Sequence, residues 1–145
     1  MFRDPIGYRI KTLSNMMKRN MECQFGPRND RATLMQGWII GFLSDREEKG
    51  LETFQKDIEE EFSINRSTTS EMLKLMTKRG MIQRLPVAKD ARLKKIVLTD
   101  ESRAINQHID RTLREMHARL TEGLTETEIE SFIVVLDKLI ANAEK

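Results

Sequence analysis

The sequence predicts a mainly α-helical fold with one small β-hairpin. Apolar residues recur at helical steps of three and four along most of the 145 residues. Near the middle, two short helical segments are separated only by the SIN stretch at 63–65, and two short strand-like segments follow directly. Amphipathic helices flank this unit on both sides. We therefore expect a helix-turn-helix with a two-stranded wing, placed between N- and C-terminal helices.

Composition limits the class of protein. A chain of 145 residues is long enough for one domain with a modest core, and a net charge of +2 excludes a strongly basic, histone-like protein. The single cysteine, Cys23, excludes an intramolecular disulfide and favours a reducing compartment. No apolar stretch approaches the roughly 18 residues of a membrane span, and the first residues lack the pattern of a signal peptide. We therefore expect a cytoplasmic location.

Two helices are predicted before the helix-turn-helix. The first covers residues 5–25, with Asp4 as its cap and Pro5 in its first turn, and carries a stripe of Ile6, Ile10, Leu13, Met17 and Met21. The GPRN stretch at 26–29 ends it, and Asn29 or Asp30 is expected to cap a second helix through LMQGWIIGFL. Because the second helix is apolar on nearly every side, we expect it to be the buried one. Gly50 ends this part of the chain.

The helix-turn-helix follows. Thr53 is expected to cap a short helix, FQKDIEEEF, whose apolar face is formed by Phe54, Ile58 and Phe62. Asn65 is expected to cap the next helix, RSTTSEMLKLMTKR, which ends at Gly80. The inward face of this helix should contain Thr69, Met72, Leu73 and Met76. Because the turn between the helices is so short, they must cross steeply.

Two strands then form the predicted wing. The strands are MIQRL and KKIVL, and the stretch PVAKDAR, which begins at Pro86, is expected to be the loop between them. Alternation along the second strand places Ile96 and Leu98 on one face, with Lys95 and Val97 on the other.

Positive charge is concentrated between Ile64 and Lys95. This segment contains nine basic and two acidic residues, a local charge of +7, so the rest of the chain carries −5 within a total of +2. Clustered Lys and Arg release counterions from a nucleic-acid backbone, which favours a polyanionic partner. A solvated surface balanced by the acidic residues just upstream explains the charge equally well. The predicted helix-turn-helix tips this balance toward DNA.

The second helix of the unit is expected to enter a major groove. Its outward residues are candidate DNA contacts, and these are Arg66, Ser67, Thr68, Ser70, Glu71, Lys74 and Lys78. The three short hydroxyl side chains are near the start of the helix, where they can approach bases or phosphates closely. The Arg and Lys side chains are expected to position the protein on phosphates.

The wing supplies a second set of candidate contacts. Arg92 is expected to enter a minor groove, and Asp90 is expected to hold the Arg92 side chain through a fork-like pair. Lys89 and Lys94 lie beside them in the sequence and are expected to contact DNA as well.

Two segments of the sequence resemble a known family. The stretches NRSTTSEMLKLMTKRGMIQR and DARLKKIVLT are similar to the recognition helix and wing of the MarR (multiple-antibiotic-resistance regulator) family. The resemblance implies a homodimeric transcription factor, usually a repressor, often with an effector site. It also implies one domain over residues 1–145, with a winged helix-turn-helix at 30–99 and dimerisation helices at 1–29 and 100–145. Glu71 and Leu75 depart from the polar or basic residues usual in the family, so the operator sequence stays open.

The C-terminal residues predict two further helices. The first begins at Asp100, carries Ile105, Ile109, Leu113, Met116 and Leu120, and is broken near Gly123. Thr125 and Glu128 form a capping box for the second. A winged helix does not need these helices for its own core. The expected dimer interface contains Ile6, Ile10, Leu13, Ile129, Phe132, Ile133, Leu136 and Ile140, and the alternative is a helical cap on a monomer.

The remaining candidate sites are weaker. Met16, Asn20 and Trp38 are candidate effector-pocket residues, for which packing is the alternative. His108 and His117 are nine residues apart on one helix and cannot chelate one metal from a single face, so no metal or cofactor is expected. No nucleophile motif or phosphate-binding glycine loop is present, so an enzyme is not expected.

The alternative function is a winged-helix module that binds a protein without sequence-specific DNA binding. A protein-binding face is expected to carry exposed apolar anchors, and on the predicted DNA face only Leu75 qualifies.

Overall fold

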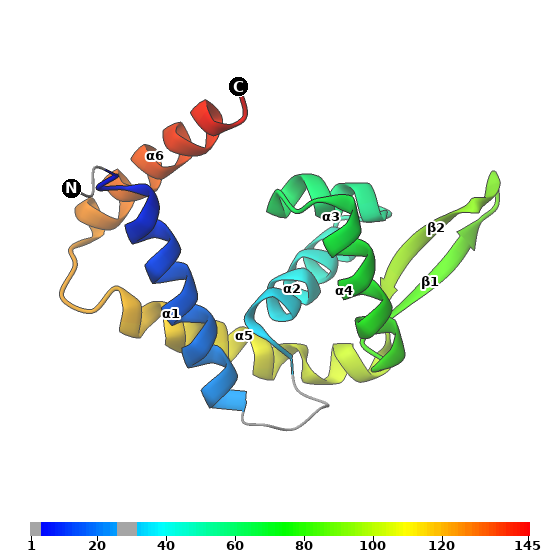
Figure 1. Ribbon diagram of the computed structural model, residues 1–145. Coiled ribbons are helices and arrows are strands. Elements are labelled where there is room, and N and C mark those ends of the chain that lie inside the picture. Colours follow the sequence, from blue (N-terminus) through cyan, green and yellow to red (C-terminus); the bar gives the residue numbers. More distant parts are fainter. Residues whose placement is uncertain (1–3, 26–31) are drawn as a thin grey trace. The chain divides into compact units, whose positions relative to one another are not determined.

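The structure is a computed structural model that describes residues 4–25 and 32–145. In chain order its elements are α1 (Gly7–Phe25), α2 (Leu34–Glu48), α3 (Gln55–Phe62), α4 (Arg66–Lys78), β1 (Ile82–Val87), β2 (Asp90–Leu98), α5 (Asp100–Leu120) and α6 (Glu126–Ala143) (Figure 1). The predicted fold class, mainly α-helical with a β-hairpin wing, is confirmed. Over the described residues, none of the helices is both long and apolar enough to cross a membrane.

The chain divides into two compact units, one ending at Thr112 and the other covering Leu113–Lys145. In the first unit α2 contacts β2, α3 contacts α4 and β2, and α4 contacts β1. The buried apolar residues of this unit come from each of these elements and from α5. They include Ile39, Ile40, Leu43, Ile58, Leu73, Met76, Ile82, Ile96, Leu98 and Ile109. The expected burial of α2 is confirmed for one side of the helix.

The first two helices begin at side-chain caps. Asp4 Oδ1 accepts hydrogen bonds from the backbone N–H groups of Ile6 and Gly7, at 3.1 and 2.7 Å, as predicted. The cap of α2 is Thr33, whose hydroxyl accepts from the Gln36 N–H while the Gln36 side chain accepts from the Thr33 N–H. The prediction of Asn29 or Asp30 as this cap was wrong, and both lie outside the described residues. The missed signal was the capping box formed by Thr33 and Gln36.

The helix-turn-helix has the predicted second cap but not the first. Asn65 Oδ1 accepts from the Thr68 N–H at 2.8 Å, and Gly80 has a left-handed φ of 73°. Thr53 does not cap α3, because Phe54 occupies that position and its N–H donates to Asp57 at 2.8 Å. The Thr53 carbonyl instead accepts from the Ile96 N–H at 2.7 Å, so this residue ties the helix pair to the wing.

The wing is a longer hairpin than expected. The strands pair in antiparallel register from Ile82 opposite Leu98 to Pro86 opposite Lys94, and a register shift then places Val87 opposite Asp90. Most of the predicted loop is therefore strand. Pro86, where the loop was predicted to begin, lies within β1, and its missing N–H is tolerated because β1 is an edge strand. Ile96 and Leu98 are buried on one face, as the alternation predicted.

Replacement of Leu73 by alanine is expected to lower the free energy of unfolding by about 2–5 kcal/mol, because a fully buried side chain is removed and a cavity remains. Leu75→Ala on the same helix is the matched control. Since Leu75 is 41% exposed, its replacement should cost less than about 1 kcal/mol. Urea unfolding at one fixed protein concentration measures both values. Equal losses of stability in the two variants would contradict the packing described for α4.

Candidate nucleic-acid interface

The polar face of α4 is directed outward by the packing of its other face. Thr69, Leu73 and Met76 have no exposed surface, and the Thr69 hydroxyl donates to the Asn65 carbonyl at 2.8 Å. Of the predicted contact residues, Ser70 is half-buried and the others are exposed, namely Arg66, Ser67, Thr68, Glu71, Lys74 and Lys78. This side of α4 is therefore accessible along its length.

Two of these outward residues form an ion pair. Lys74 Nζ lies 3.7 Å from Glu71 Oε1, with the side chains 65% and 76% exposed. A pair this exposed contributes little to stability. Its effect is local, because the Glu71 carboxylate lowers the positive potential around Lys74 on a face that is otherwise basic.

The tip of the wing is fixed through its backbone. Asp90 Oδ1 accepts a hydrogen bond from the backbone N–H of Arg92 at 2.9 Å. The predicted fork-like pair between this carboxylate and the Arg92 guanidinium was wrong, since no such ion pair occurs among the described residues. An aspartate two residues earlier reaches the backbone N–H more easily, as in an Asx-turn. The exposed side chains of Lys89, Arg92 and Lys94 surround this turn.

A cleft of about 500 Å³ brings part of the two predicted surfaces together. It lies between α3, the first turns of α4 and the wing, and Arg66 and Ser70 on α4 face it together with Arg92 and Lys94 on β2. The other lining residues are Phe54, Gln55, Lys56, Glu59, Arg84, Leu93 and Ile96. Five cationic side chains and one carboxylate therefore line one concave surface. Lys74, Lys78 and Lys89 lie outside it.

Arg84 is a cleft residue that was not among the sequence candidates. Its Nη2 atom is buried and has no hydrogen-bond partner within the described part of the chain. A buried donor without an acceptor is costly, and a guanidinium is suited to planar anions. The alternation of MIQRL contained the signal, because it places Arg84 on the same face of the strand as the buried Ile82.

The candidate dimer residues lie on two helices with large exposed apolar groups. Ile6, just before α1, and Ile10 and Leu13 on α1 are exposed. On α6, which has no buried residue, the exposed members are Phe132, Ile133 and Ile140, and the half-buried ones are Ile129 and Leu136. The Thr125 and Glu128 capping box that opens α6 is present as predicted.

The candidate effector residues do not line the cleft. Met16 and Asn20 are exposed on α1, and Trp38 is half-buried on α2. In the described part of the chain, no cluster of three or more His, Cys, Asp or Glu residues has the arrangement of a metal site.

Comparison with known proteins extends these observations. Residues 33–93 match the model of the MarR family. No curated protein sequence matches the chain. Among solved structures, the transcription regulator MarR from Oenococcus oeni PSU-1 is 29% identical, with a TM-score of 0.75 over 94% of this chain and 98% of that one.

Two further structures carry ligands. The MepR–DNA complex of S. aureus is 25% identical, with a TM-score of 0.82 over 97% of this chain and 99% of that one. The PcaV regulator of Streptomyces coelicolor in complex with its natural ligand is 18% identical, with a TM-score of 0.81 over 100% and 99% of the two chains, and supports the fold alone. The family match falls on α2, α3, α4, β1 and the start of β2, which carry all of the cleft except Lys94 and Ile96. The chain is therefore similar to the MarR family over this segment, and its fold is similar to that of solved MarR-type transcription regulators.

Proposed function

We propose that this protein is a homodimeric repressor that binds double-stranded DNA of a specific sequence and is released by an effector. The observation that carries the proposal is the joining of the polar face of α4 and the basic wing around one cationic cleft. A helix with short polar side chains at its start suits a major groove, and a basic hairpin beside it suits the adjacent backbone or minor groove.

Each group of side chains has a separate role in this proposal. Ser67, Thr68 and Ser70 contact base edges or nearby phosphates at the start of α4. Arg66, Lys74 and Lys78 contact phosphates, and Arg92 enters a minor groove between Lys89 and Lys94. Glu71 accepts from a cytosine amino group, because a carboxylate on this face is repelled by phosphate.

The cleft adds Arg84 to this set. Its buried Nη2 atom lacks an acceptor, and Arg66, Arg92 and Lys94 also line the cleft. We infer that an anion occupies this position during function, and a DNA phosphate between the wing and α4 satisfies that requirement.

A second copy of the chain is proposed to cover α1 and α6. Both helices expose large apolar side chains, and a monomer would leave them in water. A two-fold dimer presents two recognition helices to a pseudo-palindromic operator whose half-sites are about one helical turn apart. Residues 1–29 and 100–145 then serve as dimerisation helices, and residues 30–99 as the DNA-binding part.

The effector is proposed to bind residues of α1 and α2. The PcaV regulator, which has a similar fold, was solved in complex with its natural ligand. In this chain we propose Met16, Asn20 and Trp38 as the effector contacts. A cytoplasmic location follows from the same role, because the DNA lies there.

A protein-binding module is the second candidate function, and exposed leucines favour it. Leu75 was expected to be the only apolar anchor on this surface, but Leu85 and Leu93 of the wing are 39% and 45% exposed as well. The dependence of binding on salt concentration separates the two candidate functions. DNA binding weakens steeply as salt rises, whereas an apolar interface does not.

Arg92→Ala is expected to weaken binding to every duplex and to reduce the slope of log affinity against log salt by about 1, because one cation is removed from the DNA surface. Fluorescence anisotropy over a salt series measures both quantities. Arg111→Ala, which removes an exposed cation from α5, is the control and should leave the slope unchanged. An unchanged slope for Arg92→Ala would remove this residue from the interface.

Selection of bound duplexes from a random pool tests sequence specificity. The protein is expected to enrich a pseudo-palindrome, and Ser67→Ala or Thr68→Ala is expected to change the preferred bases, since base contacts specify sequence. Lys78→Ala is the control, which should lower affinity without changing the preference. Failure of the folded protein to enrich any sequence would favour the protein-binding module.

Ile133→Glu is expected to convert a dimer into monomers, because it places a charge in the apolar stripe of α6. Lys138→Glu is the control. Because an α-helix has 3.6 residues per turn, residue 138 lies on the opposite side of α6 from the apolar stripe, so this substitution should leave the dimer intact. Sedimentation velocity at micromolar concentration separates these outcomes. A wild-type monomer, or equal effects of both substitutions, would contradict the proposed interface.

A further inference from the structure

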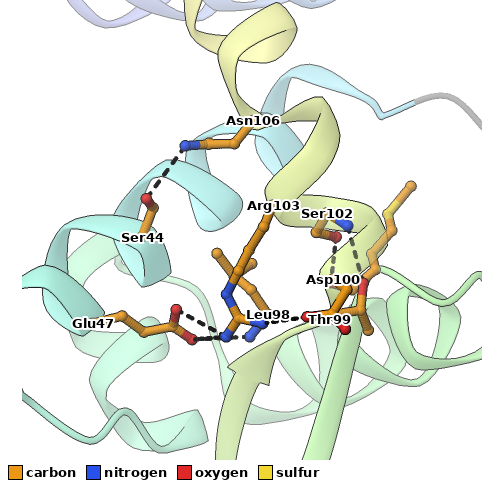
Figure 2. Close-up of polar contacts among 9 residues, drawn as sticks. Ser44, Glu47, Leu98, Thr99, Asp100, Ser102, Arg103 and Asn106 are labelled. Atoms are coloured by element: carbon orange, nitrogen blue, oxygen red, sulfur yellow. Dashed lines mark hydrogen bonds and ion pairs between the residues drawn. The ribbon is translucent and has the colours of Figure 1, made fainter.

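The junction between β2 and α5 is held from two sides by contacts with residues distant in the sequence (Figure 2). Leu98 is the last residue of β2, Thr99 follows, and α5 begins at Asp100. The wing strand therefore leads into α5 through a single residue. The contacts at this point determine how the base of the wing is held against α2 and α4.

One side of the junction depends on Glu47, in the last turn of α2. Its Oε1 atom accepts a hydrogen bond from the Leu98 backbone N–H at 3.1 Å. Both Glu47 oxygens also accept from Arg103 Nη2, at 3.3 and 3.1 Å, and Arg103 Nη1 lies 3.3 Å from Asp100 Oδ1. One carboxylate thus contacts the end of the wing strand and the first turn of α5 at the same time (Figure 2).

The other side of the junction is fixed to the turn between α4 and β1. The Thr99 hydroxyl donates to the Gly80 carbonyl at 2.6 Å and accepts from the Ser102 N–H at 3.1 Å. The buried Ser102 hydroxyl donates to the Met81 carbonyl at 2.5 Å. These neutral contacts attach the start of α5 to the turn that follows α4, and Glu47 supplies the link to α2.

Glu47 also completes the hydrogen bonding of β2. Toward the base of the wing, the Ile96 N–H donates to the Thr53 carbonyl and the Leu98 N–H donates to Glu47, so neither is used in pairing with β1. The first of these acceptors is backbone and cannot be removed by substitution. The second is a side chain, 29% exposed, whose position depends on its ion pair with Arg103.

We propose that Glu47 and Arg103 are positioning residues for DNA binding, which hold the base of the wing at the angle that α4 and the wing need to contact one duplex. The inference rests on the proposed DNA-binding function. Neither residue lines the cationic cleft. They act through Leu98, and the ion pair links the first turn of α5 to the wing strand.

The direction in which Glu47→Ala changes DNA affinity separates a positioning role from a general electrostatic effect. Glu47→Ala removes a negative charge, so general attraction to DNA alone predicts tighter binding. Removal of the hydrogen bonds from Leu98 and Arg103 predicts weaker binding, by about fivefold or more, because these charge-assisted bonds hold the base of the wing. Glu48→Ala removes the same charge from the next residue, which is exposed, and is the matched control.

The test measures affinity for a selected duplex with the full chain carrying Glu47→Ala, Glu47→Gln, Arg103→Ala or Glu48→Ala. Binding is expected to weaken in Glu47→Ala and Arg103→Ala, and to be intermediate in Glu47→Gln, whose amide oxygen can still accept from Leu98. Glu48→Ala should bind as tightly as the wild type or more tightly. Urea unfolding confirms that each variant is folded under the assay conditions.

Double-mutant cycles identify the wing as the route of the effect. Glu47→Ala combined with Arg92→Ala is expected to be non-additive, because the Arg92 side chain reaches DNA only from the wing position that Glu47 maintains. Glu47→Ala combined with Lys74→Ala on α4 should be additive. A general loss of stability would give the same behaviour in both cycles. Equal additivity, or tighter binding by Glu47→Ala, would overturn the proposal.

A measurement without DNA keeps the two proposals separate. Amide hydrogen exchange in β1 and the first turn of α5 is expected to accelerate in Glu47→Ala and to stay unchanged in Glu48→Ala. If the wild-type protein bound no duplex, the proposed DNA-binding function would be contradicted. The hydrogen-exchange rates would still show whether Glu47 holds the base of the wing. Unchanged exchange in Glu47→Ala would reject the positioning role directly.

Discussion

The burial of one face of α4 is the constraint on which the rest of the binding surface depends. Thr69, Leu73 and Met76 have no exposed surface, and the Asn65 cap fixes where the helix begins. Because these positions recur at helical spacing, they set the rotation of α4 about its axis, and its polar side chains then have only one direction to face. The wing follows α4 after the left-handed Gly80, so the same packing also sets where the hairpin starts. A change on the buried face would therefore disturb both surfaces at once.

The cleft combines cations with different conformational freedom. Arg66, Arg92 and Lys94 are exposed, and ordering such long side chains on a ligand costs rotamer entropy. Arg84 is half-buried, so much of this ordering has already occurred in the free protein. Arg84 therefore sets one position in the cleft, and the exposed cations, which include Lys56, adapt to the bound polyanion around it.

Several features set by neighbouring residues were predicted from the sequence, although the Thr33 cap of α2 and the backbone contact of Asp90 were missed. The contacts between residues far apart in the sequence were not predicted. The Asn65 cap, the Gly80 turn and the capping box at Thr125 are all set by residues within a few positions, and each occurs as expected. The Thr53 assignment failed because Arg46 Nε donates to its hydroxyl at 2.7 Å and Ile96 on β2 donates to its carbonyl. The link between Glu47 and Arg103 joins residues 56 positions apart, so no local pattern could indicate it. Strand alternation could have placed Arg84 on the inward face of β1. It could not have shown that the buried Nη2 atom of Arg84 lacks an acceptor.

The absence of buried side chains in α6 has a consequence for how this protein responds to heat. An 18-residue helix is marginal in water by itself, because most helical stability in proteins comes from packing of an apolar face. In the proposed dimer the partner supplies that packing, so folding of α6 and association become one equilibrium. The midpoint of thermal unfolding then rises with protomer concentration through mass action, and dilution of the dimer destabilises its C-terminal helix.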